Sequence, residues 1–496
     1  MMRGSSIYIG GCSVKKTFVT LLSLVLVFGL LSACSGGSKK EGELAPLGKD
    51  EEAKIKVMFW DQSIFFQEYG NMFTTQFPNI EIEVANMQSI YNQSAAETME
   101  EQLDKFLEER KPDVLMLHTG EYERLAQNGK LMALDSVIEQ DQFETEGIHP
   151  AILKLLREQG GGRLYGLSPE FSSSALYYNI DLFNKYGVEL PRDSMSWEEV
   201  FELAKRFSTE GDKDSKIYGL STDTYLNLSN LIQLIGTSQD LKMLSADGSS
   251  FNINTSSWKK VFESVIGAVK SGTLYVPDQE AKAFNFTTME EMFQRNLFVM
   301  GRSAMAVKSS YEVQQILQAK EMLKEVTPVN WGVVTVPVDP NNRNQSSYFN
   351  LGSIFAVSAD SANPRAAWEF IKYINGDPFA KLKSKSLYGS LLSRIEHNPD
   401  KDGRSMEPFY KLEPKANVNN EYTKAPINFF GTLNALVEAE IDAALNDKKT
   451  VEEALEEIQE KGEAELLKAR KAAEEANPSP SASSANSESE SSSPSQ

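Results

Sequence analysis

Short apolar runs alternate with helical patterns along most of the chain, and this alternation leaves few architectures open. Residues 55–60 form an apolar run, residues 66–77 carry a helical pattern, and residues 80–84 alternate apolar with charged side chains as a strand does. A second helical pattern at residues 97–109 precedes another apolar run at residues 113–117. Strands that alternate with helices favour a mostly parallel sheet covered by helices, so we predict an α/β fold.

Capping signals mark the starts of two later helices. Ser196 is followed three residues later by Glu199, and Thr450 by Glu453. In such a capping box each of the two side chains bonds the backbone N–H of the other residue. We therefore predict a helix after each box, the second one rich in Glu, Lys and Ala.

Composition excludes several classes of function. The 496 residues include 50 Lys plus Arg against 70 Asp plus Glu, and the net charge of −20 disfavours binding to DNA, RNA and anionic lipid surfaces. Three His and two Cys cannot build a thiolate zinc site or a disulfide framework. We therefore predict no metal, no cofactor and no nucleic-acid partner.

The N-terminus has the order of a secretory signal. Basic residues precede an uncharged apolar run at residues 17–30, which is short for a membrane span, and small residues follow. The stretch LSAC resembles the lipobox of bacterial lipoproteins, which implies that residues 1–33 are a signal peptide and that Cys34 is lipidated. Because two acyl chains suffice for stable anchoring, we expect the protein on the outer face of a bacterial cytoplasmic membrane. A plain signal peptide with an incidental Cys, or a signal anchor, is the alternative.

Polar segments flank the expected folded body. Residues 34–53 contain Gly and lack apolar periodicity, which indicates a flexible spacer behind the lipid. Residues 477–496 contain ten Ser, three Pro and no large apolar side chain. Such a segment cannot bury enough surface to offset its ordering entropy, so we predict a disordered tail.

Several stretches of the body stand in a distinctive order. They include KIKVMFWD at the first strand, PDVLMLHTGEYERLAQNGKLMALD after the second helix, RLYGLSPEFSSSALYYNIDLF, GRSAMAVKSSYEV and WGVVTVPV. This order resembles the family 1 extracellular solute-binding proteins, the maltodextrin-binding type that serves ABC transporters. The resemblance implies an α/β, two-lobed fold of the periplasmic-binding-protein type II class, with a hinge and a ligand cleft between the lobes. It places residues 54–167 plus 337–383 in one lobe and residues 168–336 plus 384–476 in the other.

Residues just after strand runs are the first candidates for ligand contact, because ligands of open α/β sheets collect at the carboxyl ends of strands. Trp60 and Asp61 follow the first apolar run, and His118 and Thr119 follow the run at residues 113–117. An aromatic face contacts a sugar ring, and a carboxylate accepts hydrogen bonds from sugar hydroxyls. A core position for Trp60 and a helix-cap contact for His118 are the alternatives.

The resemblance adds further candidates near the crossovers between the lobes. Glu170 and Phe171 stand where the family commonly places ligand contacts, and Tyr311 stands where maltodextrin-type proteins carry a stacking Trp. A Tyr keeps the stacking over a smaller area, so the solute can differ. The remaining candidates lie near the later crossovers: Tyr348 with its neighbour Phe349, Gly352 and Tyr388. Three other aromatic residues lie within helical patterns and are expected in the core: Trp197, Trp258 and Trp368.

The body of the chain shows no enzyme signature. No GxSxG, HExxH, P-loop or GxGxxG stretch occurs in residues 54–476. We predict a lipid-anchored, monomeric binding protein without catalytic activity, which delivers an oligosaccharide to the permease subunits of an ABC importer. A peptide, a polyamine or a glycerophosphodiester is the alternative solute, since a fold does not fix its ligand. A secreted glycoside hydrolase with two carboxylates, or an adhesin, is the alternative from another class.

Overall fold

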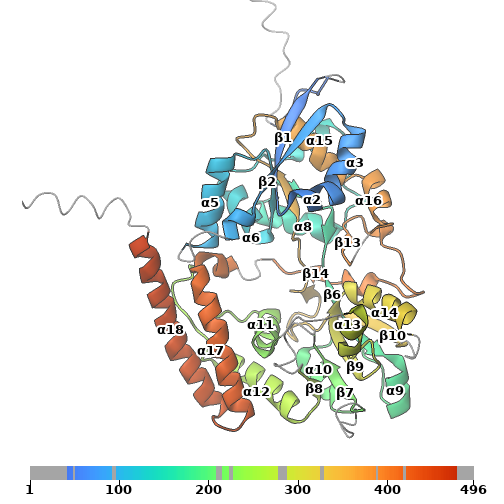
Figure 1. Ribbon diagram of the computed structural model, residues 1–496, viewed down its shortest axis with the longest axis vertical. Helices are drawn as coiled ribbons and strands as arrows, with labels where there is room; N and C mark the ends of the chain where they lie inside the picture. The colour runs from blue at the N-terminus through green and yellow to red at the C-terminus, as the bar shows by residue number, and fades with distance from the viewer. Residues whose placement is uncertain are drawn as a thin grey trace, which may run out of the picture.

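The structure is a computed structural model that describes residues 42–48, 51–91, 97–207, 215–222, 227–276, 288–323, 329–386, 389–416 and 420–476. These residues form two α/β lobes, each built around a five-stranded sheet (Figure 1). We call the body around the N-terminal sheet lobe 1 and the body around the other sheet lobe 2. The predicted two-lobed α/β architecture is confirmed. The predicted signal peptide, Cys34 and the Ser-rich tail lie outside the described residues.

The sheet of lobe 1 has the strand order β2-β1-β3-β12-β4. Its strands are β1 (Ala53–Phe59), β2 (Ile80–Asn86), β3 (Val114–Leu117), β4 (Gly166–Leu167) and β12 (Ile354–Val357). β1 runs parallel to β2 and β3, whereas β12 is antiparallel to both β3 and β4. The strands β1, β3 and β4 therefore end at one edge of the sheet, and β12 starts there.

Strand β2 is an edge strand of this sheet. Its side chains alternate between more buried and more exposed positions, as the sequence predicts. Ile80 is buried, whereas Glu81 and Glu83 are exposed. Lys54 on the neighbouring strand β1 lies 3.0 Å from Glu81 and 3.3 Å from Glu83, and Lys56 lies 3.3 Å from Glu83. The edge strand β2 and its neighbour β1 are thus joined by a row of ion pairs.

Helices cover both faces of the lobe 1 sheet (Figure 1). They are α2 (Gln62–Phe65), η1 (Phe66–Gly70), α3 (Asn71–Gln76), α4 (Gln88–Tyr91), α5 (Met99–Arg110), α6 (Thr119–Gln127), α7 (Asp135–Gln140), α8 (Pro150–Gln159), α15 (Pro364–Ile374) and α16 (Asp377–Lys383). The helix predicted at residues 66–77 begins earlier, because Asp61 caps it, and its middle turn η1 is π-helical. Phe65 and Phe73 of this segment pack against Phe370 of α15.

The sheet of lobe 2 has the strand order β10-β6-β9-β7-β8. Its strands are β6 (Ser174–Asn179), β7 (Tyr218–Ser221), β8 (Leu274–Tyr275), β9 (Ser303–Ser309) and β10 (Trp331–Thr335). β6 is antiparallel to β10 and β9, and β7 is parallel to β9 and β8. Both lobes therefore hold mixed sheets, a departure from the mostly parallel arrangement expected.

The helices of lobe 2 include the C-terminal pair α17 and α18, which pack side by side (Figure 1). They are α9 (Ile180–Tyr186), α10 (Trp197–Ala204), α11 (Leu228–Ser238), α12 (Ser256–Lys270), α13 (Met289–Arg295), α14 (Tyr311–Met322), α17 (Ile427–Leu445) and α18 (Val451–Ala476). Both predicted capping boxes are confirmed: the hydroxyls of Ser196 and Thr450 accept the N–H of Glu199 and Glu453, whose carboxylates accept in return. The three tryptophans expected in the core are at most 2% exposed: Trp197, Trp258 and Trp368.

Short paired segments link the lobes. β5 (Glu170–Phe171) pairs antiparallel with β13 (Leu391–Leu392), and β11 (Gln345–Ser346) pairs parallel with β14 (Glu413–Pro414). Three turns of 3-10 helix lie in the C-terminal linking region: η3 (Ile395–His397), η4 (Glu407–Phe409) and η5 (Asn420–Lys424). The chain therefore crosses between the lobes at several places that bond to one another.

We propose the lobe boundaries given by the resemblance, residues 54–167 plus 337–383 and residues 168–336 plus 384–476. Within the last range, Ser393 accepts the backbone N–H of His149 at 2.8 Å, and Arg394 donates to the carbonyl of Glu144 at 2.6 Å. These two residues therefore lie against lobe 1.

Two parts of the predicted spacer are described: residues 42–48, which lie on lobe 1, and residues 51–53, of which Ala53 begins β1. The backbone N–H of Leu44 donates to Oε1 of Gln140 at 3.0 Å, and Nε2 of Gln140 donates to the carbonyl of Leu44 at 2.7 Å. Leu44 and Leu47 also pack against the lobe 1 core. Among the described residues, no helix is both long enough and apolar enough to cross a bilayer.

Candidate functional site

A cavity of about 470 Å³ lies beside the edge of the lobe 1 sheet where β1, β3 and β4 end. Lobe 1 lines it with residues of α5, α6 and α8, including His118 and Thr119 at the end of β3. Lys415 and Thr423 line it from the side of lobe 2, where Lys415 pairs with Asp240 at 3.0 Å. Its size falls within the range of small-molecule sites, and its position between the lobes matches the predicted cleft.

The first turn of α6 (Thr119–Gln127) forms one wall of the cavity. The backbone N–H of His118 donates to Oε2 of Glu121 at 2.9 Å, which fixes the start of the helix. Burial raises the pKa of the Glu121 carboxyl, while the nearby His118 and Arg124 act in the opposite direction. Glu121 is thus a structural cap and a lining residue at once.

Each cationic Lys or Arg side chain found in this lining has a carboxylate partner. Arg124 makes a two-pronged ion pair with Asp104, with N–O distances of 2.8 and 3.0 Å. Oε1 of Glu100 accepts the hydroxyl of Thr423 at 2.9 Å, so one hydrogen bond joins α5 of lobe 1 to η5 across the cavity. Because each of these cations is paired with a carboxylate, the lining offers polar groups in fixed orientations rather than a free positive charge.

An aromatic ring completes the lining. Phe349 faces the cavity, and its ring stacks on Phe171 with centroids 4.5 Å apart and planes 13° apart. Phe171 itself is 2% exposed and is absent from the described lining. Phe349 is the aromatic residue of the described lining.

Some of the strand-end residues predicted from the sequence lie close together, and one of them does not face the cavity. The rings of Trp60 and His118 lie 5.7 Å apart, and Trp60 is half-buried against the core. A methyl group added to Gly352 would stand 3.9 Å from Nδ1 of His118, which places Gly352 at the same wall. The carboxylate of Asp61 instead accepts the N–H groups of the next helix turn, at 2.8 and 3.0 Å.

The crossover candidates lie elsewhere around the hinge. Glu170 is held by Lys383 at 3.5 Å and by the hydroxyl of Tyr69 at 3.4 Å, and burial raises the pKa of its carboxyl against the effect of Lys383. Tyr311 begins α14 and lies beside Gly389. Tyr348 packs against lobe 2, and burial raises the pKa of its hydroxyl. Tyr388 lies outside the described residues.

Sequence reasoning did not select several lining residues. Glu100 and Arg124 lie on helices, away from any strand end, and Lys415 and Thr423 come from a region without clear periodicity. Other lining residues stand directly next to predicted positions, such as Gly120, which follows Thr119, and Phe349, already named with Tyr348, which follows Tyr348.

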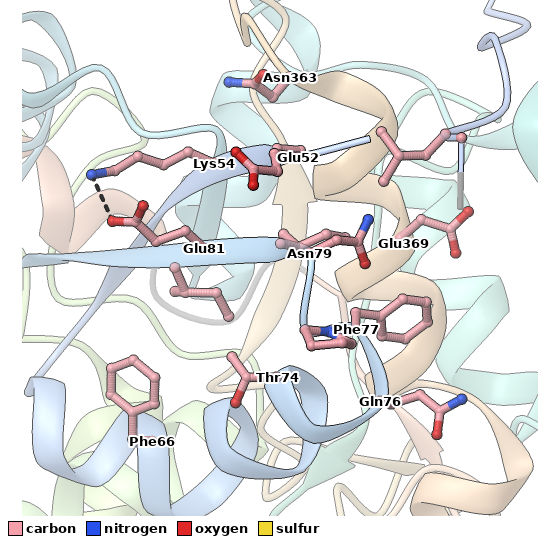
Figure 2. A pocket seen from close by; sticks show the side chains of 16 residues that line it. Glu52, Lys54, Phe66, Thr74, Gln76, Phe77, Asn79, Glu81, Asn363 and Glu369 are labelled. Carbon is pink, nitrogen blue, oxygen red and sulfur yellow. Dashed lines mark ion pairs between the residues drawn. The ribbon is translucent and has the colours of Figure 1, made fainter. Parts of the chain in front are cut away.

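A wider hollow of about 1470 Å³ lies at the opposite edge of the lobe 1 sheet (Figure 2). Lys54, Asn79 and Glu81 line it at the N-terminal ends of β1 and β2, and Figure 2 shows the ion pair between Lys54 and Glu81. Because ligands of open α/β sheets bind at the carboxyl ends of strands, we assign the solute site to the smaller cavity.

The fold and the cavity between the lobes are those of a two-lobed solute-binding protein. The family model described as "Bacterial extracellular solute-binding protein" matches residues 68–389, which is more than half of the chain. The chain therefore belongs to the bacterial extracellular solute-binding proteins. The prediction that it is not an enzyme agrees with this family of binding proteins.

Relatives of known name are similar at low identity. The sn-glycerol-3-phosphate-binding periplasmic protein UgpB of Brucella melitensis is 22% identical over 399 residues, which cover 77% of this chain and 86% of the relative. The UgpB protein of Agrobacterium fabrum is 21% identical over 311 residues, covering 60% of this chain and 66% of the relative.

Solved structures share the fold. The sugar-binding protein MalE from Xanthomonas citri has a TM-score of 0.59 at 16% identity, covering 84% of this chain and 98% of that one. A solute binding protein of an ABC transporter from Agrobacterium vitis, with bound D-mannitol, has a TM-score of 0.52 at 17% identity, covering 84% and 99%. At these identities the likeness concerns the fold alone.

Proposed function

We propose that this protein is the solute-binding component of an ABC importer and that its solute is an oligosaccharide held in the cavity between the lobes. The observation that carries the proposal is the lining itself, which combines polar side chains, their cations paired with carboxylates, with the ring of Phe349. Polar groups of this kind suit hydroxyls, and an aromatic face suits the apolar face of a sugar ring. Structures of the same fold include one described as a sugar-binding protein and one with bound D-mannitol, so the fold accommodates solutes of this size and polarity.

The mechanism follows from two lobes joined at a hinge. A solute favours the closed state only to the extent that it binds that state more tightly than the open one. His118 and Thr119 on lobe 1 face Lys415 and Thr423 across the cavity, so a solute that bonds both sides stabilises closure. The closed form is then the one presented to the permease subunits.

A phosphorylated polyol is the second candidate solute. The relatives named for sn-glycerol-3-phosphate favour it, and Arg124 supplies a guanidinium group to the lining. The carboxylate partner of Arg124 favours a neutral solute instead. A pair of probes, maltotriose and sn-glycerol-3-phosphate, separates the two classes.

The binding test is a thermal-shift screen of the soluble protein beginning at Ser35. A solute at a hundred times its dissociation constant adds about 2.7 kcal/mol to the free energy of unfolding, which raises the melting temperature visibly. We expect sugars to raise it and Phe349→Ala to abolish the shift. Leu467→Ala, at a 50% exposed position on α18, is the matched control. A folded protein whose melting temperature no sugar or polyol phosphate changes would refute the proposal.

The proposed lipid anchor is tested separately. The sequence LSAC supports lipidation of Cys34. We expect the wild-type protein to sediment with membranes and to incorporate a palmitate analogue, and Cys34→Ser to lose both properties. Equal labelling of the two proteins would contradict the anchor without affecting the binding proposal.

A further inference from the structure

We propose that Phe171 is a positioning residue for the solute site: it holds the ring of Phe349 in the cavity and connects solute contact to the hinge. This inference rests on the proposed function, because it assigns a role within the same site. It concerns a buried side chain that would not touch the solute. Three segments that cross between the lobes are hydrogen-bonded to one another, and Phe171 lies in the middle one.

The strand around Phe171 lies between two other crossings. On one side Glu170 and Phe171 pair with Leu392 and Leu391 of β13. On the other side Ser172 exchanges two backbone hydrogen bonds with Asn350, with N–O distances of 3.0 and 2.9 Å. The three crossings therefore form a narrow ribbon with the strand of Phe171 at its centre.

This central strand passes from one lobe to the other within a few residues. Before Phe171, the carboxylate of Glu170 is held by Lys383 and Tyr69 of lobe 1, at 3.5 and 3.4 Å. After it, the carbonyl of Ser173 accepts the N–H of Ser310, at the end of β9 in lobe 2, at 3.3 Å. A change in the angle between the lobes must therefore be absorbed close to Phe171.

Stacked aromatic rings connect the segment around Phe171 to the cavity. Phe349 shows one side to the cavity and stacks on Phe171, and Phe171 meets Tyr410 edge to face at 6.5 Å. Asn350 lines the cavity and pairs with Ser172 through its backbone. A solute that presses on Phe349 and Asn350 thus contacts the partners of the hinge strand directly.

The test is a double-mutant cycle with maltose, maltotriose and D-mannitol as probes. Phe171→Leu keeps an apolar side chain but removes the stacked ring, and Phe349→Leu removes the ring that meets the solute. We expect Phe171→Leu to weaken binding about two- to tenfold, the range that a lost aromatic pair supports. If Phe171 acts through Phe349, the double variant binds no more weakly than Phe349→Leu alone.

Two further variants separate positioning from loss of stability. Phe171→Tyr keeps the ring and is expected to retain wild-type affinity, while Phe183→Leu, in the buried core of lobe 2, is expected to lower the melting temperature without changing affinity. If Phe171→Leu does not fold, Phe171→Met replaces it, because the unbranched, flexible side chain of Met adapts better to the space that the ring leaves.

The outcomes are distinct. Additive losses in the double variant, or an unchanged affinity of Phe171→Leu, would overturn the inference while leaving the proposed function intact. A folded wild-type protein that binds none of the three probes would remove the sugar-binding proposal and this inference with it.

Discussion

Asp141, which directly follows α7, links two helices of lobe 1 through its charged side chain. Its carboxylate accepts both Nη groups of Arg365 at 2.9 Å, Nε1 of Trp368 at 3.0 Å and Nζ of Lys372 at 2.8 Å. All three donors lie on α15, so one carboxylate ties α7 to that helix. The side chain of Asp141 is only 10% exposed. We predict that Asp141→Asn destabilises the protein measurably.

The magnitude follows from the pKa of Asp141. Burial alone would raise it, but the hydrogen bonds from Arg365, Lys372 and Trp368 outweigh burial and lower the pKa from 3.8 to about 2. At about 1.36 kcal/mol for each pKa unit, the charged form contributes at most about 2.5 kcal/mol at neutral pH. Solvent at the rim of the network screens part of this, so we expect a loss of about 1.5 to 2 kcal/mol.

The sign of the pH dependence is fixed by the direction of this pKa change. A carboxyl group whose pKa is lower in the folded state adds stability above the unfolded pKa, and that stability is lost as the pH falls toward the folded pKa. The contribution is therefore complete above about pH 5, falls to about half near pH 3 and fades below about pH 2. Asp141→Asn should lack this dependence.

Urea denaturation of the wild type and Asp141→Asn at pH 7 and pH 3 measures both effects. The exposed Asp360, changed to Asn, serves as the control and is expected to stay within about 0.5 kcal/mol of the wild type. A difference below about 0.5 kcal/mol between wild type and Asp141→Asn at pH 7, or one that does not shrink at pH 3, would refute the reasoning.

Three smaller predictions concern separate contacts. Gly389 has φ of +88°, and a Cβ there would stand 2.9 Å from Cβ of Tyr311, so Gly389→Ala should cost at least about 1 kcal/mol in urea unfolding; an unchanged midpoint would show that the hinge relaxes freely. Gln140→Ala removes both bonds to Leu44, and hydrogen exchange at the Leu44 amide should speed up by about tenfold or more; equal rates would mean that the spacer is held by other contacts. Thr450→Ala removes the cap of α18 and should cost about 1 kcal/mol, whereas Thr450→Ser should cost little; equal losses would argue against the cap.

Much of lobe 1 follows from the sequence because its strands and helices are strongly patterned. The runs at residues 55–60 and 113–117 became β1 and β3, and their adjacency in the sheet brings Trp60 close to His118. The order of strands was less accessible, since β12 enters from far along the chain and runs antiparallel. Hydrophobic patterns carry no information on strand direction when both faces are covered.

The cavity was harder to predict than the fold for a related reason. Arg124 and Glu100 face it from helices whose polar surfaces contain many similar residues. The packing of α5 against η5 selects Glu100, and Arg124 of α6 lies 3.9 Å from Glu100. Asp61 shows the converse case: a strand-end carboxylate that looked suited to a solute is used to start α2. Local signals cannot separate a helix cap from a ligand contact, because both need the same oxygen atoms.

The charged residues of the edge strand β2 affect how copies of the protein interact with one another. Free sheet edges invite a strand from a neighbouring molecule. Glu81 and Glu83 are exposed on the edge strand and would lose much of their water on such an addition. A second copy would bring the same two carboxylates to the interface. The edge strand therefore helps to keep copies apart, which suits a protein expected to work as a monomer.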